Sequence, residues 1–97
     1  MIIITAKCIL KDNKKEEFIK VAQEMIEETN KEIGCISYNL YEDINDENIV
    51  TFIEEWESRE AIEGHNNSEH VKRIVPMFNE LRVEKPTINL YEKVEAR

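Results

Sequence analysis

Two histidines and one tryptophan lie close together in the sequence and could take part in proton transfer. Trp56 ends an apolar stretch that also contains Glu54, and His65 and His70 follow shortly after it. An imidazole with an unperturbed pKa of about 6.5 suits the removal of a proton near neutral pH. We therefore take His70 as the candidate base, while Trp56 is either a core residue or a platform for a ligand.

The spacing of the histidines does not favour a metal site. Common metal-binding patterns place two ligands as HxH, HxxxH or HExxH, and His65 and His70 fit none of them. The chain also lacks a GxGxxG motif, a P-loop and a Ser-His-Asp pattern. The residues alone thus predict a small-molecule pocket without a metal, and they do not identify a reaction.

The elements that must position these residues follow from the hydrophobic pattern. Residues 2–10 are rich in β-branched side chains and predict a strand. After a polar turn, apolar residues at helical spacing predict an amphipathic helix that ends near Ile33 and Gly34. Strands are expected at 35–42, 48–56 and 85–94, and helices at 58–64 and from residue 67 or 68 onward. The order βαββαβ predicts one α+β domain over residues 1–97, ferredoxin-like, with helices on one face of an antiparallel sheet.

Several residues are expected to mark the ends of the helices. Asp12 or Asn13 can cap the first helix, Ser58 can cap the second, and Gly34 supplies a left-handed stop. Pro76 lies inside the last helical pattern and lacks a backbone N–H, so a kink or a break is expected there.

The short link between the second and third strands predicts a hairpin and its register. If Glu42 pairs near Val50, Tyr38 faces Glu54 and Ile36 faces Trp56. Side chains on one face of such a hairpin would form a single surface, and both histidines could reach the space above it. The expected surface consists of Tyr38, Leu40, Phe52, Glu54 and Trp56.

The strands are apolar on both faces, whereas a half-buried strand alternates. Residues 2–4 are all Ile, and Ile49 and Ile53 oppose Val50 and Phe52. Two helices cover only one face of the sheet, so the other face is expected to pack against a second copy in a homodimer.

Composition narrows the partners and the compartment. The net charge of −8 disfavours nucleic acid and anionic membrane surfaces. No apolar run approaches the roughly 20 residues of a membrane span, and the N-terminal stretch lacks the features of a signal peptide. Cys8 and Cys35 form no paired motif, which fits two reduced thiols. We expect a cytoplasmic protein.

The sequence resembles the antibiotic biosynthesis monooxygenase domain family over nearly its whole length. The resemblance rests on residues 33–38, on residues 52–62, which contain the Glu-x-Trp-x-Ser-x-Glu-Ala core, on His65 and on the Ser68-Glu69-His70 stretch. It implies a dimeric α+β barrel built from two ferredoxin-like subunits. It also implies a cofactor-independent monooxygenase that oxidises a quinol or a related small phenolic compound with dioxygen, without flavin or metal.

Carried onto this chain, the resemblance gives roles to individual residues. Trp56 would line the pocket and His70 would be the catalytic base. Tyr38 and Glu54 would orient substrate groups. Further contacts to the small aromatic substrate would come from His65, Phe52 and Phe78.

Three other functions remain open. Heme degradation is disfavoured, because Ala6 and Asn66 occupy the positions where that branch of the family has an Asn and a His. A non-oxygenase enzyme that processes phosphorylated signal sugars would need a cation such as Arg73 or Arg82 for the phosphate. The third alternative is a non-catalytic dimeric binding module.

Overall fold

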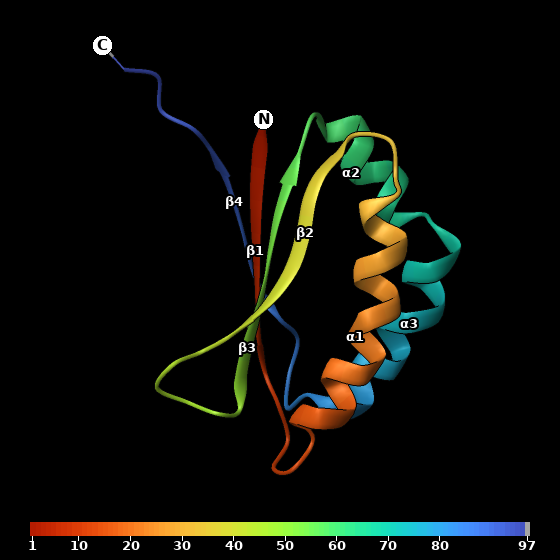
Figure 1. The fold of residues 1–97 in the computed structure, drawn as a ribbon, viewed down its shortest axis with the longest axis vertical. Helices are drawn as coiled ribbons and strands as arrows, with labels where there is room; N and C mark the ends of the chain where they lie inside the picture. The colour runs from red at the N-terminus through yellow and green to blue at the C-terminus, as the bar shows by residue number, and fades with distance from the viewer. Residues whose placement is uncertain (97) are drawn as a thin grey trace.

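Three helices cover one face of a four-stranded antiparallel sheet (Figure 1). The structure is a computed structural model that describes residues 1–96. The sheet has the strand order β2-β3-β1-β4, with β1 and β3 in its centre. The predicted ferredoxin-like α+β fold is confirmed. Its elements are β1 (Ile2–Ile9), α1 (Lys15–Asn30), β2 (Cys35–Glu42), β3 (Ile49–Trp56), α2 (Arg59–Asn66), α3 (Glu69–Leu81) and β4 (Thr87–Glu92).

The core lies between the sheet and the helices. In β1 the side chains of Ile2, Ile4, Ala6 and Cys8 are buried in alternation, as expected for a strand with one covered face. Phe18 of α1 stacks on Phe78 of α3, with ring centroids 4.4 Å apart. These contacts fix both long helices over the centre of the sheet and position the residues that α2 and α3 present to it.

The starts of α2 and α3 follow the expectations, whereas both ends of α1 differ from them. α1 ends at Asn30, with Lys31 in a right-handed conformation, so Gly34 lies in the following turn and does not stop the helix. Ser58 and Ser68 cap α2 and α3 by accepting hydrogen bonds from the backbone N–H groups of Ala61 and Val71. The prediction that Asp12 or Asn13 caps α1 is wrong: its N-cap residue is Lys14, which makes no side-chain hydrogen bond to the helix. Asn13 instead adopts a left-handed conformation with φ of 64°, and Asp12 accepts a hydrogen bond from Asn48.

The last helix and strand differ from the prediction in extent. α3 continues through Pro76, so the expected break does not occur. Its buried residues Ile74, Phe78 and Leu81 lie on both sides of the proline and hold the helix on the core. β4 is shorter than predicted, and all six of its residues are exposed because no helix covers this edge strand.

The hairpin register is the predicted one up to its last pair. Glu42 pairs with Val50, and Tyr38 pairs with Glu54. The pairing of Ile36 with Trp56 is wrong, since Cys35 faces Trp56 and a β-bulge lies between Cys35 and Ser37. The extra residue leaves Tyr38 and Glu54 together on the face toward the helices.

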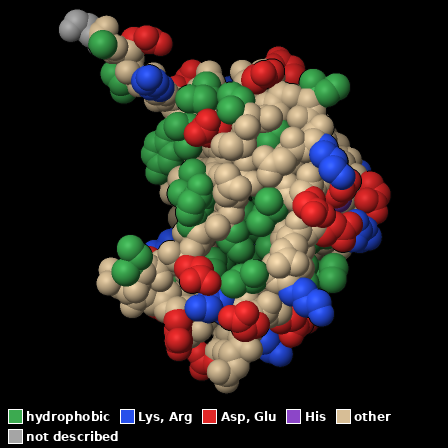
Figure 2. All heavy atoms as spheres, viewed as in Figure 1, with side chains coloured by type: hydrophobic (Ala, Val, Ile, Leu, Met, Phe, Trp, Pro, Cys, Tyr) green, Lys and Arg blue, Asp and Glu red, His purple; other side chains and the backbone are tan. Residues whose placement is uncertain are grey.

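The other face of the sheet carries apolar side chains that no element of the described chain covers. Ile9, Ile53 and Tyr91 are 37%, 38% and 51% exposed. Figure 2 shows hydrophobic side chains gathered on the side of the sheet and β4, while charged side chains dominate over the helices. Within residues 1–96, no helix is long and apolar enough to cross a membrane.

Candidate active site

A mostly apolar cavity of about 240 Å³ opens between the sheet and the helices α2 and α3. A second hollow of about 220 Å³ adjoins it along β4 and shares Ala6, Glu54, His65, Asn66 and Ile88 with it. Small-molecule sites are concave and apolar with a few converging polar groups, as here. The larger cavity is lined by Ala6, Cys8, Met25, Tyr38, Phe52, Glu54, His65, Asn66, Val71, Val75, Phe78, Arg82, Pro86 and Ile88.

Two further hollows lie at the surface and differ from this cavity in their lining. One is bordered by Asn13, Glu47 and neighbouring polar residues. The other lies beside Gly34 and Ser58. Neither is lined by an aromatic ring, so the cavity under α2 and α3 is the candidate site for an aromatic compound.

Glu54 is the acidic group of this cavity. It lies on β3 and faces the helices, where it is only 7% exposed. Its Oε1 accepts a hydrogen bond of 3.0 Å from the indole Nε1–H of Trp56. Burial raises the pKa of Glu54 to about 7, the Trp56 hydrogen bond opposes this shift, and the negative charge of Glu32 adds to it. Near neutral pH this carboxyl can both accept and return a proton.

Aromatic rings form the wall around Glu54. Tyr38 lies opposite it on β2, and its ring is 5.2 Å from that of Phe52. Phe52 in turn lies 5.7 Å from Phe78 of α3. Burial above all, with a contribution from the Glu54 charge, holds the pKa of Tyr38 well above its usual value. Tyr38 therefore keeps its hydroxyl proton and can donate a hydrogen bond to a ligand.

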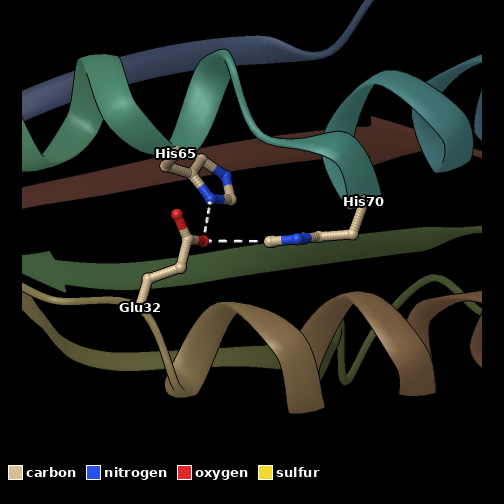
Figure 3. A group of neighbouring side chains, drawn as sticks. All are labelled: Glu32, His65 and His70. Atoms are coloured by element: carbon tan, nitrogen blue, oxygen red, sulfur yellow. Dashed lines mark hydrogen bonds and ion pairs between the residues drawn. The ribbon is translucent and has the colours of Figure 1, made fainter.

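The two histidines meet a glutamate that sequence reasoning missed (Figure 3). Nδ1 of His65 lies 2.7 Å from Oε2 of Glu32, and Nε2 of His70 lies 3.1 Å from the same oxygen. Glu32 stands in the turn after α1, whereas the histidines come from α2 and α3. Spacing along the chain gives no indication of this cluster, because its members lie on three separate elements.

The structure separates the predicted site residues into two groups. Tyr38, Phe52, Glu54, His65 and Phe78 line the cavity. Trp56 is fully buried behind Glu54, and His70 points to Glu32 rather than lining the cavity.

His65 connects the two groups. Its ring lies 4.9 Å from Trp56 and 5.5 Å from Tyr38, while its Nδ1 reaches Glu32. Burial lowers the pKa of His65, although the hydrogen bond and the charge of Glu32 oppose that shift. The neutral imidazole therefore dominates near neutral pH.

Asn66 and Arg82 also line the cavity and were not predicted as contacts for an aromatic substrate. Arg82 follows α3 and reaches Asn79 and the thiol of Cys8. Both cysteines are free, as expected. The sequence signal for Arg82 is its position one residue after the apolar stripe of the last helix. That signal does not show that its side chain reaches the cavity.

The fold and the cavity define a small α+β protein with a site for a small, mostly apolar molecule. Residues 1–77 match the family described as "Antibiotic biosynthesis monooxygenase". A Bacillus subtilis (strain 168) relative named "Putative monooxygenase YcnE" is 32% identical over 81 residues, which are 84% of this chain and 85% of the relative. The chain therefore belongs to the antibiotic biosynthesis monooxygenase family.

Two further similarities support the fold over its full length. An uncharacterized protein of Synechocystis, sll1783, is 33% identical over 96 residues, and this chain spans only 65% of that relative's length. The crystal structure of a conserved protein from Methanosarcina mazei Go1 is 36% identical and superposes with a TM-score of 0.93, covering 96% of this chain and 92% of that one.

Proposed function

We propose that the protein is a cofactor-independent monooxygenase that oxidises a quinol or a similar one-ring phenol. A 1,4-hydroquinone and dioxygen would give a hydroxyquinone and water. One oxygen atom enters the ring, the other leaves as water, and all four electrons come from the substrate. Such a reaction needs a site that removes a phenolic proton and stabilises negative charge on oxygen.

The observation that carries this proposal is Glu54, a carboxyl with a pKa of about 7 in a cavity walled by aromatic rings. A general base works best when its pKa lies near the working pH. Glu54 would take the proton of the phenol and later return one to the departing water. We prefer Glu54 to His70 as the base because Glu54 lines the cavity and His70 does not.

Other cavity residues would bind and orient the substrate. The protonated Tyr38 would donate a hydrogen bond to the oxygen that gains negative charge. Phe52 and Phe78 would pack against the ring, and His65 would contact the second hydroxyl. Trp56 would act through Glu54, and His70 through Glu32 and His65. The volume of about 240 Å³ lies below the usual range of ligand pockets, roughly 300–1,000 Å³, which favours a single ring.

Oxygen consumption with a panel of substituted hydroquinones tests the proposal. Glu54→Gln should lower kcat at least about 100-fold, the lower end of what a general base contributes. Glu57→Gln alters an exposed acid outside the cavity and should retain the wild-type rate. If no hydroquinone is consumed faster than in buffer, or if Glu54→Gln is as fast as the wild type, the proposal fails.

His70→Ala in the same assay separates the two candidate bases. If Glu54 is the base, His70→Ala should keep most of kcat, because His70 lies outside the cavity. A loss as large as that of Glu54→Gln would assign the base role to the His70 cluster.

We further propose a homodimer in which two sheets pack face to face. The support is the uncovered apolar surface that includes Ile9, Ile53 and Tyr91. A second copy would bury it and leave the helix side, with its cavity, outside the interface. We place the protein in the cytoplasm, in keeping with its two free thiols.

A phosphate ester is the second candidate substrate, and Arg82 is the observation that favours it, because its side chain lines the cavity. Arg73 does not contribute, since its guanidinium pairs with Glu24 and Glu69 on the surface. A rise in thermal stability with sugar phosphates but not with hydroquinones would favour this candidate.

A further inference from the structure

We propose that Glu32, His65 and His70 bind one divalent transition-metal ion of the zinc type. This site goes beyond the proposed oxygenation, which requires no metal. It lies behind one wall of the cavity and joins the turn after α1 to the helices α2 and α3 (Figure 3).

The three ligand atoms already lie at separations close to those of a metal site. They are all within 4.8 Å of one another, and Oε2 of Glu32 is 2.7 and 3.1 Å from the two histidine nitrogens. Two ligands bound to zinc at about 2.0–2.2 Å, at roughly a right angle or wider, are about 3 Å or more apart. Small rotations of the imidazole rings would therefore be enough to admit an ion between the three atoms.

The charges around Glu32 favour a cation at this place. The Glu32 side chain is only 16% exposed, and in the described chain its ion-pair partners are the two histidines, without a Lys or Arg. A shielded carboxylate without a permanent positive partner is costly to bury. A divalent ion would supply that charge, and the net charge of −8 of the whole chain adds to the attraction.

The donor set selects the class of ion. Two imidazoles and one carboxylate suit zinc and its first-row neighbours, whereas calcium and magnesium prefer oxygen ligands alone. Two hydroxyl groups lie beside one of the ligand atoms: Thr29 Oγ1 and Ser68 Oγ are each 3.4 Å from Nε2 of His70. Either hydroxyl, or a water held by it, could complete a tetrahedral shell.

A metal bound here would hold the helical side of the cavity in place. α2 and α3 are joined through Asn67 and Ser68, and each would be fixed to the turn after α1 by one histidine. His65 would be held beside the substrate site, because its ring lines the cavity while its Nδ1 faces Glu32. Metal loading is thus expected to raise thermal stability and to restrict the motion of His65.

Cobalt(II) titration of the tag-free, chelator-stripped protein tests the site. The wild type should bind one equivalent, with the intense visible absorption of a four-coordinate Co(II) ion, and Zn²⁺ should displace it. Glu32→Gln and His70→Ala should weaken binding at least 10-fold, and Zn²⁺ should raise the melting temperature of the wild type but not of these two variants. Glu63→Gln, an exposed acid on α2, should behave as the wild type.

Glu32→Gln keeps the size and a hydrogen-bond acceptor at this position, so it serves if His70→Ala fails to fold. The inference is overturned if Co(II) gives no such absorption, or if Glu32→Gln binds as tightly as the wild type. It is also overturned if a thiolate charge-transfer band appears and is lost in Cys35→Ser, which would locate the ion at that cysteine. Oxygen consumption in chelator is a separate readout that tests the oxygenation proposal independently of this site.

Discussion

The indole N–H of Trp56 donates a hydrogen bond of 3.0 Å to Oε1 of Glu54, two residues earlier on β3. Because the strand period is two, both side chains point toward the helices. Trp56 is fully buried, so this donor occupies a fixed position beneath the cavity. A core residue thereby tunes the proton affinity of a cavity residue, and the hydrogen bond favours the charged form of Glu54 against the effect of burial.

Trp56→Phe is predicted to shift the pH dependence of activity. The substitution removes the N–H that lowers the pKa of Glu54, so the acid limb of kcat/KM should move upward from about pH 7. Phe18→Leu, another core substitution outside the cavity lining, should leave that limb in place. An unchanged limb in a folded Trp56→Phe protein would contradict the tuning role.

Glu54→Gln is predicted to stabilise the protein in alkaline but not in acidic solution. The folded-state pKa of Glu54, about 7, exceeds its ordinary value of 4.5, so the folded state binds more protons between these values. The contribution of Glu54 to the free energy of unfolding is therefore fully present below pH 4.5 and is lost as pH rises through 7.

Ionisation of the buried Glu54 lowers the free energy of unfolding by about 3 kcal/mol at most. A glutamine at this position carries no charge and avoids this loss. Urea unfolding at pH 5 and pH 8 measures the difference. The Gln variant should gain roughly 1–3 kcal/mol relative to the wild type at pH 8 and little at pH 5. Equal differences at both pH values would show that the Glu54 pKa is not raised.

Alanine substitutions at the two glycines are predicted to change the stability of the fold in opposite directions. Gly34 has φ of 87°, and an added Cβ would lie 2.5 Å from the Cβ of Ala61. Gly34→Ala should therefore destabilise the fold by more than about 1–2 kcal/mol, the cost of the left-handed backbone alone. Gly64 lies in α2, and a Cβ there would meet nothing within 4 Å. Gly64→Ala should stabilise by about 0.5–1 kcal/mol, since Ala favours a helix. Thermal or urea unfolding of both variants measures these differences, and a stable Gly34→Ala protein would contradict the described turn.

The sequence predicts local features well, apart from the end of α1. Gly34 has the expected left-handed backbone, but it lies in the turn after α1, which already ends at Asn30, so it does not stop the helix. Short-range rules gave the element order, the cap at Ser58, the start of a helix near Ser68 and the pairing of Tyr38 with Glu54. These features depend on residues that are close in sequence or joined by one short loop.

The remaining features depend on contacts between distant segments. The bulge beside Ile36 changes the pairing of Trp56, and the sequence does not predict it because β2 and β3 contain no proline or glycine. The contacts of Glu32 with His65 and His70 form only when three separate elements pack together. In the sequence, nothing distinguishes Glu32 from the other acidic residues of the chain. Local patterns identified the cavity-lining residues of the strands, but they did not show that His70 points to Glu32 instead of lining the cavity.

Ile53→Lys is predicted to convert the proposed dimer into a monomer. Ile53 lies on the central strand β3, faces away from the helices and is 38% exposed in the single chain. Burying a lysine ammonium between two sheets without a partner would cost several kcal/mol, more than a small interface tolerates. Ile44→Lys is the matched control, because Ile44 lies in the hairpin loop and is 97% exposed.

Light scattering should give twice the chain mass of 11.5 kDa for the wild type and Ile44→Lys, and the single mass for Ile53→Lys. Since the cavity lies on the opposite side of the sheet, a monomeric Ile53→Lys protein should still bind a hydroquinone. A wild type of single-chain mass, or an Ile53→Lys protein that remains dimeric, would rule out packing through this face.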